Sequence, residues 1–358
     1  MNTERASRIE SVRIMVTYNW MFLRHLYLSV QDRLGDAGLA ALETGIRRHG
    51  YYRGESLRSS PRGCSSPRGA FAVLRAWDTA ELAMASAGEQ LDVTGDAAEA
   101  IVELQRVSGS EYFASNDGGE VLALYWREML AGLVAGYDAA LSISYNPVEA
   151  CGAGEWTMRF AFAGAQSDAD VQPPADAFTD AVQAIEMSRR TAGVFSGLCM
   201  HTTQALVERF GGTGEEVARQ ALYAFGAERA VGMREEAQRR GMPLDFKSWY
   251  DIMAKRDPDS AAWVFRDNTH VSPGVFQVTC TYCPMADVWA EEGTAGLSLG
   301  YIYDMEVHRG LVEAFNPEGI VAWEQVKTRG DRVCNFRFSI PSLVTADDPP
   351  WARGLTNK

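Results

Sequence analysis

An internal repeat constrains the fold of this chain more than any other feature. Residues 34–58, LGDAGLAALETGIRRHGYYRGESLR, match residues 210–234, FGGTGEEVARQALYAFGAERAVGMR, without a gap. The offset of 176 residues places glycines and arginines of one stretch on those of the other, and it also carries His25 onto His201. Farther along, Tyr145-Asn-Pro147 matches Phe315-Asn-Pro317 at an offset of 170. The repeated unit is far longer than the roughly 20–50 residues of a solenoid repeat, so we interpret it as a whole module.

The length of the chain fits two such modules. A chain of 358 residues accommodates about two domains of roughly 150 residues each. The polar stretch AGAQSDADVQPPAD contains paired prolines, which favour a linker. We therefore expect a first module over residues 1–165, a linker over 166–176, a second module over 177–342 and a tail over 343–358. We expect the modules to bury their hydrophobic faces together as an internal pseudo-dimer, which could itself form a homo-oligomer.

The periodicity of apolar residues predicts the same order of elements in each module. Apolar residues at three- and four-residue spacing predict two helices at the start of each module, over 6–33 and 36–49 and then over 182–209 and 212–225. We expect Gly50 and Gly226 to end the second helix of each pair. Short β-rich runs, a further helix and a closing hairpin follow in each module: 100–107, 119–139, 141–146 and 156–162 in the first; 263–265, 275–279, 295–314, 319–327 and 332–340 in the second. Helices followed by small antiparallel sheets predict an α+β fold made twice.

Composition excludes several classes of partner. The net charge of −13 argues against nucleic acid, because binding phosphates requires clusters of lysine and arginine. The first residues carry charges of both signs and lack the pattern of a signal peptide, and no run is apolar enough to span a membrane. The six cysteines do not form the dense pattern of a disulfide scaffold. We therefore expect a cytoplasmic protein that acts on a small molecule without a cofactor.

The most distinctive short motif is CTYCP at residues 280–284. A zinc knuckle normally has a second pair of ligands, which this chain lacks, and the surroundings do not have the pattern of a thioredoxin-type redox pair. Two buried inert cysteines and a single working thiol are the other two interpretations. In an ungapped comparison of the modules, Cys280 falls on Gln105 and Cys283 on Ser108. Polar replacements in the first module favour a site that exists in the second module only.

The closing hairpin is the second motif from which local structure can be predicted. In AWEQVKTRGDRVCNFRF, we expect a three-residue loop over 328–330 with Gly330 in the left-handed conformation. This register places Lys327 opposite Asp331, Gln325 opposite Val333 and Glu324 opposite Cys334, so that Glu324 and Cys334 share one face of the strand pair. A register shifted by one residue would separate Glu324 from Cys334.

These motifs, in this order, resemble the L-2-amino-thiazoline-4-carboxylic acid hydrolase family. CTYCP, a helix that contains Asp304, Glu306 and His308, the FNP turn and GDRVCNFRF carry the resemblance, which covers residues 180–342 and more faintly the first module. It implies a hydrolase that opens a cyclic amidine such as a thiazoline ring, at a C–N or C–S bond, in specialised bacterial metabolism. The end of the chain is also similar to vinyl-reductase-type ligand-binding domains, which implies a non-catalytic small-ligand protein as the alternative. The family pattern has a cysteine on the helix YIYDMEVHRG, and this chain does not.

The resemblance and the residue types together suggest roles for the candidate residues. We expect Cys283 to be the nucleophile, His308 the base or acid, and Asp304 and Glu306 the helpers. Asp304 and His308 share a helix face at i and i+4, so the carboxylate could orient the imidazole ring, whereas Asp304 and Glu306 cannot both face one pocket. The candidate substrate-binding residues are Cys280, Tyr282, Trp289, Tyr303, Glu324 and Cys334. No metal ligand is assigned, and His25 and His201 are expected to make buried polar contacts common to both modules.

Overall fold

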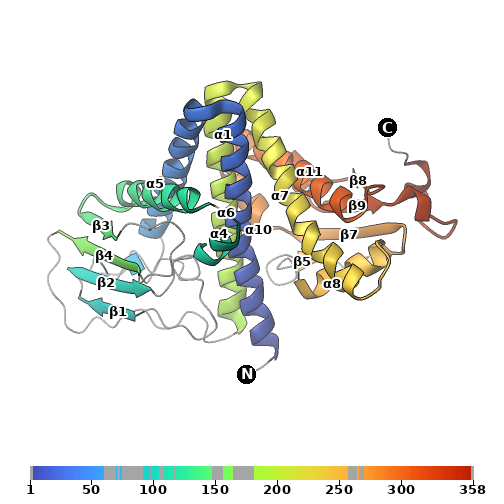
Figure 1. The fold of residues 1–358 in the computed structure, drawn as a ribbon, viewed down its shortest axis with the longest axis horizontal. Helices are drawn as coiled ribbons and strands as arrows, with labels where there is room; N and C mark the ends of the chain where they lie inside the picture. Colours follow the sequence, from blue (N-terminus) through green and yellow to red (C-terminus); the bar gives the residue numbers. More distant parts are fainter. Residues whose placement is uncertain are drawn as a thin grey trace. The chain divides into compact units, whose positions relative to one another are not determined.

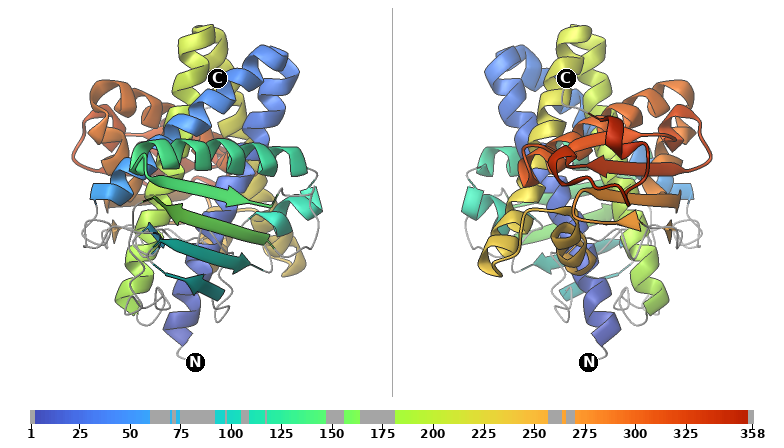
Figure 2. Two further views of the ribbon diagram at one scale, coloured as in Figure 1. Left: turned by 90° about the vertical axis from the view of Figure 1, so that its left-hand side faces the viewer. Right: turned by 90° about the vertical axis from the view of Figure 1, so that its right-hand side faces the viewer.

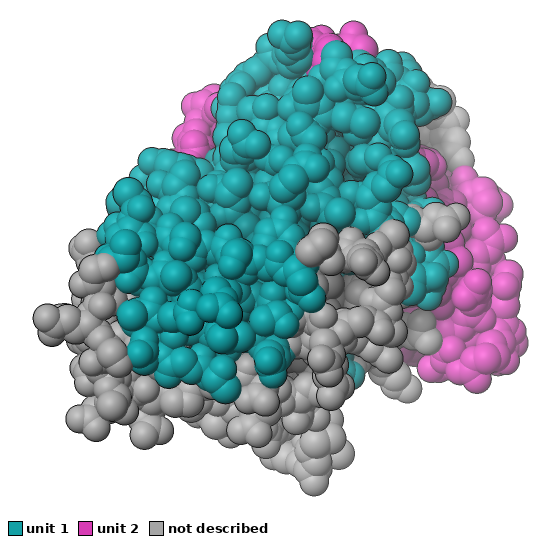
Figure 3. Space-filling model, turned by 60° about the vertical axis from the view of Figure 1, so that its left-hand side comes forward, with its two compact units in different colours: residues 1–209 teal, residues 210–358 magenta. Residues whose placement is uncertain are grey.

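The computed structural model contains two compact units. It describes residues 3–59, 70, 73–74, 92–96, 98–104, 109–116, 118–146, 156–163, 181–256, 264–265 and 270–355. The first unit covers residues 1–209 and the second covers residues 210–358 (Figure 3). The predicted linker over 166–176 lies outside the described residues, so the module boundary remains a prediction from the repeat. Both units combine helices with a small antiparallel sheet, so the fold is α+β as predicted.

The first unit has one antiparallel sheet and long helices. Its sheet has the order β1-β2-β4-β3, and α5 runs beside β3 (Figure 2, left). In chain order its elements are α1 (Thr3–Ser59), β1 (Asp92–Gly95), β2 (Glu99–Leu104), α4 (Ser110–Asn116), α5 (Gly119–Tyr137), β3 (Leu141–Tyr145), β4 (Trp156–Phe162) and α6 (Ala181–Phe210), whose last residue belongs to the second unit.

The second unit repeats this plan. Its sheet has the order β5-β7-β9-β8, and β6 also pairs with β7 (Figure 1; Figure 2, right). Its elements are α7 (Gly212–Arg239), α8 (Phe246–Arg256), β5 (Val264–Phe265), β6 (His270–Val271), β7 (Val275–Tyr282), α10 (Pro284–Glu291), α11 (Gly293–Phe315), β8 (Ile320–Trp323), β9 (Cys334–Ser339) and the short 3-10 helices η1 (Lys327–Arg329), η2 (Pro341–Leu343) and η3 (Ala352–Gly354).

Strand register relates the two sheets residue by residue. β2 and β4 pair Ala100 with Phe160, and β7 and β9 pair Phe276 with Phe338. All four side chains are buried, so they mark the same place in the two sheets, at an offset of 176 for the first strand and 178 for the second. The predicted match of Tyr145-Asn-Pro147 with Phe315-Asn-Pro317 is therefore wrong. Tyr145 ends a strand, β3, whereas Phe315 ends a helix, α11.

The glycines of the repeat have two different structural roles. Gly35 and Gly211 adopt nearly the same left-handed backbone, with φ of 58° and 57°, and separate the first helix of each pair from the second. Gly50 and Gly226 do not end the second helices, because α1 continues to Ser59 and α7 to Arg239.

The reason is that Gly50 and Gly226 lie at helix crossings. A Cβ at Gly50 would lie 2.1 Å from the carbonyl oxygen of Met129 on α5, and a Cβ at Gly226 would lie 2.1 Å from that of Val307 on α11. Only a residue without a side chain allows the two backbones to approach this closely.

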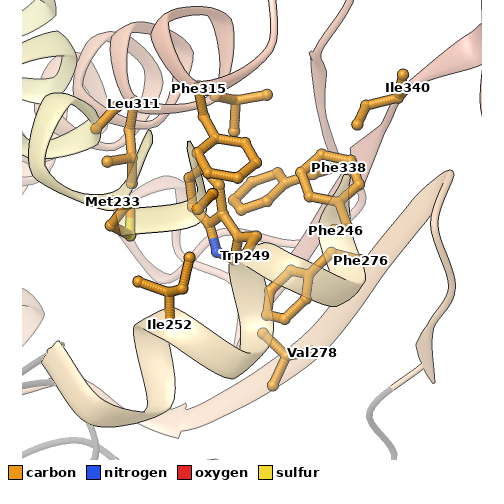
Figure 4. Packing of buried hydrophobic residues seen from close by; sticks show 13 residues of the cluster. Met233, Phe246, Trp249, Ile252, Phe276, Val278, Leu311, Phe315, Phe338 and Ile340 are labelled. Carbon is orange, nitrogen blue, oxygen red and sulfur yellow. The ribbon is translucent and has the colours of Figure 1, made fainter. Parts of the chain in front are cut away.

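Aromatic side chains build the core of the second unit between α7, α8, α11 and the sheet (Figure 4). Trp249 of α8 packs edge-on against Phe315 of α11, with ring centroids 5.0 Å apart. Phe276 of β7 stacks on Phe338 of β9 at 5.6 Å. This core fixes α11 against β7 and β9, which carry the candidate site residues.

The closing hairpin has a different register from the predicted one. β8 and β9 pair Trp323 with Phe336, one residue away from the register that would oppose Glu324 and Cys334. Residues 327–329 form the 3-10 helix η1, which Gly330 ends with the predicted left-handed φ of 91°. η1 takes up Lys327, which the prediction assigned to the strand, and β8 ends at Trp323, before the predicted end at residue 327.

A carboxylate fastens the C-terminal segment to the sheet. Asp348 accepts hydrogen bonds from Ser272 Oγ at 2.5 Å and from the backbone N–H of Thr345 at 2.7 Å, and it lies 3.1 Å from His270 Nε2. Burial alone would raise the pKa of Asp348, but these hydrogen bonds hold it at about 2. Trp351 Nε1 donates to Gln277 Oε1 on β7 at 2.9 Å. We refer to these contacts as the tail clamp.

Within the described part of the chain, no helix is both long enough and apolar enough to cross a membrane.

Candidate functional site

A buried carboxylate on α11 is the centre of the candidate site. Asp304 is 7% exposed, and Thr328 Oγ1 of η1 donates a hydrogen bond to its Oδ2 at 2.7 Å. Burial raises the pKa of Asp304 to about 7, although the hydrogen bond from Thr328 opposes the shift. A carboxyl group with this pKa exchanges its proton near neutral pH, which suits a general acid or base.

His308 lies one turn farther along the same helix, as predicted, but the predicted role of the carboxylate is wrong. Nδ1 of His308 is 2.7 Å from the backbone carbonyl oxygen of Asp304, not from its carboxylate. A carbonyl oxygen only accepts, so Nδ1 carries the proton and the lone pair of the neutral ring is on Nε2. Burial in an apolar environment lowers the pKa of His308 to about 4, against the hydrogen bond to Asp304 and helped by the charge of Arg229. The ring is therefore a neutral base at neutral pH.

Two aromatic rings connect His308 to a cluster of thiols. Trp323 of β8 and Phe336 of β9 contact the imidazole, with centroid distances of 5.1 and 5.0 Å. The same two rings pack against Cys280, Val326 and Cys334.

The three cysteines of this region differ in exposure. Cys280 on β7 and Cys334 on β9 are buried and directly opposite each other in the register, whereas Cys283 is half-buried. Burial raises the pKa of the Cys334 thiol, and negative charge on Asp304 or Cys283 raises it further. Cys334 is therefore a neutral thiol, and its sulfur accepts the backbone N–H of Lys327 at 3.3 Å. Cys283 is the most exposed thiol of the three.

Cys283 stands at the start of α10. It is the N-cap residue, and Pro284 occupies the first turn, where its missing N–H costs nothing. The partial positive charge at a helix N-terminus favours a thiolate over a thiol. We refer to Asp304, His308, Thr328, Cys283 and Cys334 together as the α11 site.

Glu306 points to a different neighbour from Asp304. Its carboxylate accepts a hydrogen bond from Arg219 of α7 at 3.0 Å and pairs with Arg309 at 2.7 Å. The two carboxylates are two residues apart on α11, so they lie on different faces, as the sequence predicted. These contacts place Glu306 in the packing of α11 on α7.

The other predicted residues divide between the packing and the surface. Trp289 and Tyr303 are buried against each other, with ring centroids 5.2 Å apart. Tyr282 ends β7, and its carbonyl oxygen accepts the thiol of Cys280 at 3.0 Å. The predicted Glu324–Cys334 pair is wrong: Glu324 is exposed and binds Arg337 and Asn335 instead. The one-residue register shift separates Glu324 from the thiols.

Sequence reasoning missed Thr328 and Lys327. Both were assigned to the hairpin as turn and strand residues, without a role in the site. Thr328 is 4% exposed, although it stands in a tight turn between charged residues. A buried threonine in such a turn is unusual, yet only the tertiary structure identifies Asp304 as its partner.

Among the described residues, no group of three or more histidine, cysteine, aspartate or glutamate side chains is arranged to hold a metal ion. Cys64 and Cys151 lie outside those residues.

Comparison with known proteins relates the residues of this site to a protein family. Residues 190–338 match the model of the L-2-amino-thiazoline-4-carboxylic acid hydrolase family, and this range contains every residue of the α11 site. Neither the curated proteins nor the solved structures gave a match. Over this C-terminal part, the chain is therefore similar to the L-2-amino-thiazoline-4-carboxylic acid hydrolase family.

Proposed function

We propose that the second unit hydrolyses a C–N or C–S bond in a small cyclic amidine, of which a thiazoline is one example. The family of residues 190–338 supports the reaction class. The observation that carries the proposal is the buried Asp304, which Thr328 orients and whose pKa of about 7 allows proton transfer at neutral pH.

The α11 site offers a group for each step of such a reaction. Cys283 is the nucleophile: its thiolate attacks the carbon between the two heteroatoms and forms a covalent adduct. The protonated carboxyl of Asp304 delivers its proton to the departing nitrogen or sulfur. Nε2 of neutral His308 then removes a proton from the water that hydrolyses the adduct, which releases the Cys283 thiolate. Glu306, held by arginines, belongs to the scaffold of this site.

The two titrating groups give the reaction a definite pH dependence. Asp304 must be protonated to act as an acid, so turnover falls as the pH rises through about 7. His308 must be neutral to act as a base, so turnover also falls as the pH drops through about 4. The plot of kcat/KM against pH is therefore expected to be bell-shaped between these limits.

The test is a hydrolysis assay of the purified full-length protein with L-2-amino-thiazoline-4-carboxylate and with an imidazoline analogue. We expect D304N and C283A each to lower kcat/KM by about 100-fold or more. D287N is the matched control for the first change, because Asp287 is an exposed aspartate on α10, and C199A is the control for the second. Both controls should retain wild-type turnover.

Three results would contradict the proposal in different ways. Loss of turnover in D304N with wild-type turnover in C283A would replace the thiol by water as the nucleophile. Equal turnover in D304N and D287N would remove Asp304 from the chemistry. Tight binding without any ring opening by the wild-type protein would support the alternative function, a small-ligand protein similar to vinyl-reductase-type domains.

A further inference from the structure

Two buried thiols are opposite each other on neighbouring strands, and one of them, Cys334, belongs to the α11 site. The register of β7 and β9 makes Cys280 and Cys334 direct partners, and neither forms a disulfide in this structure. Directly opposite residues of an antiparallel pair have Cβ atoms about 4.5–5.5 Å apart, on the same face of the sheet. A disulfide requires Cβ atoms about 3.5–4.5 Å apart, so a small shift of the two strands suffices.

Burial protects this pair from direct attack. Cys280 is 0% exposed and Cys334 is 3% exposed, so a solute cannot reach either sulfur without opening the sheet. Cys283 differs from both, because it is half-buried at the start of α10 and packs against the same cluster as Cys280 and Cys334. It is therefore the thiol of the three that a small molecule can reach.

We propose that Cys280 and Cys334 form a cross-strand disulfide when the protein encounters a small-molecule disulfide, and that Cys283 is the thiol that reacts first. The modification site is thus a set of three thiols with an outer member and an inner pair. Its chemical partner is a low-molecular-weight disulfide, which supplies the oxidising equivalents.

The exchange proceeds in three balanced steps. The Cys283 thiolate attacks one sulfur of the small disulfide, so the S–S bond breaks, one small thiolate leaves and a mixed disulfide forms at Cys283. Cys334, after loss of its proton to solvent, attacks the Cys283 sulfur and expels the second small thiolate. Cys280, likewise deprotonated, attacks the Cys334 sulfur and releases Cys283 as a thiolate. Two protein thiols are oxidised, and one small disulfide is reduced to two thiols.

The new bond changes the α11 site through a short chain of contacts. The sulfur of Cys334 accepts the backbone N–H of Lys327, and the next residue, Thr328, holds the carboxyl of Asp304. Forming the disulfide moves the sulfur away from Lys327 and disturbs η1, the turn that presents Thr328. Oxidation is therefore expected to lower turnover, a consequence that rests on the proposed function.

The experiment maps disulfides in the full-length protein after incubation with oxidised glutathione at mildly alkaline pH. Remaining thiols are blocked with an alkylating agent, and the protein is digested without reduction and analysed by mass spectrometry. We expect a linked peptide pair that joins Cys280 to Cys334 in the wild-type protein and in C199A, whose missing thiol is buried in the first unit. In C283A the linked pair should form about tenfold more slowly, because only the inner thiols remain.

Several outcomes would overturn the proposal, and the first needs no variant. The absence of any linked pair in the wild-type protein, or a link between Cys280 and Cys283, would exclude the cross-strand disulfide. An unchanged rate in C283A would exclude Cys283 as the first thiol to react. These measurements do not use hydrolysis, so they stand even if the proposed function fails. If the wild-type protein does hydrolyse its substrate, oxidation should lower kcat/KM about tenfold and a reducing agent should restore it. Oxidised C280A should lose more turnover than the oxidised wild-type protein, because Cys283 then stays bonded to glutathione or to Cys334.

Discussion

The helices α5 and α11 occupy the same place in two similar units, yet they carry different chemistry. With the offset of 178 that the strand register gives, Trp126 stands where α11 has Asp304, and Leu130 stands where it has His308. Trp126 is fully buried and packs near Trp20 and Tyr125. At the position where the second unit buries a titrating carboxyl, the first unit therefore has a large apolar side chain.

The packing contacts of the two helices, in contrast, are nearly the same. Gly132 of α5 approaches the carbonyl oxygen of Arg47, and Gly310 of α11 approaches that of Tyr223, in each case with an added Cβ about 2 Å away. Glu128 is buried and paired with Arg47, as Glu306 is with Arg219. Features common to both units thus belong to the scaffold, and features of the second unit alone belong to the site.

The same comparison corrects the alignment of the thiols. β2 and β4 pair Leu104 with Trp156 at the place where β7 and β9 pair Cys280 with Cys334. The counterpart of Cys280 is therefore Leu104, not Gln105 as the ungapped alignment predicted. Two apolar residue types thus stand in the first sheet at the positions that the two buried thiols occupy in the second, and Cys283 is the accessible cysteine of the three.

The largest expected effect tests the contrast between Asp304 and Trp126. The pKa of Asp304 is about 7 in the folded protein and about 3.8 in the unfolded chain, so between these values the folded state binds more protons. The contribution of Asp304 to the free energy of unfolding should therefore fall as the pH rises from about 4 to about 7. D304N removes this dependence, so its stability relative to the wild-type protein should increase by up to about 4 kcal/mol across that range.

Urea denaturation of wild type and D304N at several pH values measures this difference, with the exposed-residue variant D287N as the control. If the difference in unfolding free energy between wild type and D304N does not change with pH, Asp304 is not a buried titrating group. Asp304 and Trp126 would then not differ in the way proposed.

A smaller effect tests the equivalence of the scaffolds. G50A and G226A each place a Cβ 2.1 Å from a carbonyl oxygen of the crossing helix, so the helices must separate. We expect each substitution to lower the free energy of unfolding by about 3 kcal/mol. G212A is the matched control, because a Cβ at Gly212 has no atom within 4 Å. Chemical denaturation compares the three variants, and a large cost in only one of G50A and G226A would break the equivalence.

The smallest effect concerns the paired carboxylates. E128Q and E306Q each weaken hydrogen bonds between a buried carboxylate and arginines that are partly or largely exposed, so we expect a loss of about 1–2 kcal/mol in both. Turnover should change little in E306Q, because its contacts belong to the helix crossing. Unfolding and hydrolysis measured on the same samples check both points. A loss of turnover in E306Q as large as that in D304N would return Glu306 to the catalytic group.

Local patterns located several elements closely, but they missed α4, α8 and α10 and gave the wrong register for the closing hairpin. The predicted strand over 156–162 has the limits of β4, and the predicted helices over 119–139 and 295–314 match α5 and α11 to within two residues. Gly50 and Gly226 misled the prediction, because a glycine can end a helix or permit a close crossing and only the partner helix distinguishes the two. The observed hairpin register differs by one residue from the predicted one, and η1 forms a 3-10 turn that no residue type in the loop predicts.

The site followed the same division. The i and i+4 spacing correctly put Asp304 and His308 on one helix face, because it depends only on helix geometry. The contact of Asp304 with Thr328 joins residues 24 positions apart, and the facing of Cys280 by Cys334 depends on strand order. Neither follows from a single segment. The raised pKa of Asp304 depends on its burial, which the sequence alone does not reveal.

The tail clamp has a practical consequence for handling this protein. Asp348 and Trp351 tie the final segment to β6 and β7, the strands that lead into the thiol motif. Truncation upstream of Asp348 would leave Ser272 and His270 without their acceptor and uncover the face of Gln277. Affinity tags and fusion partners are therefore best attached beyond Trp351. Proteolytic cleavage between residues 341 and 348 should increase the rate of amide hydrogen exchange in β6 and β7.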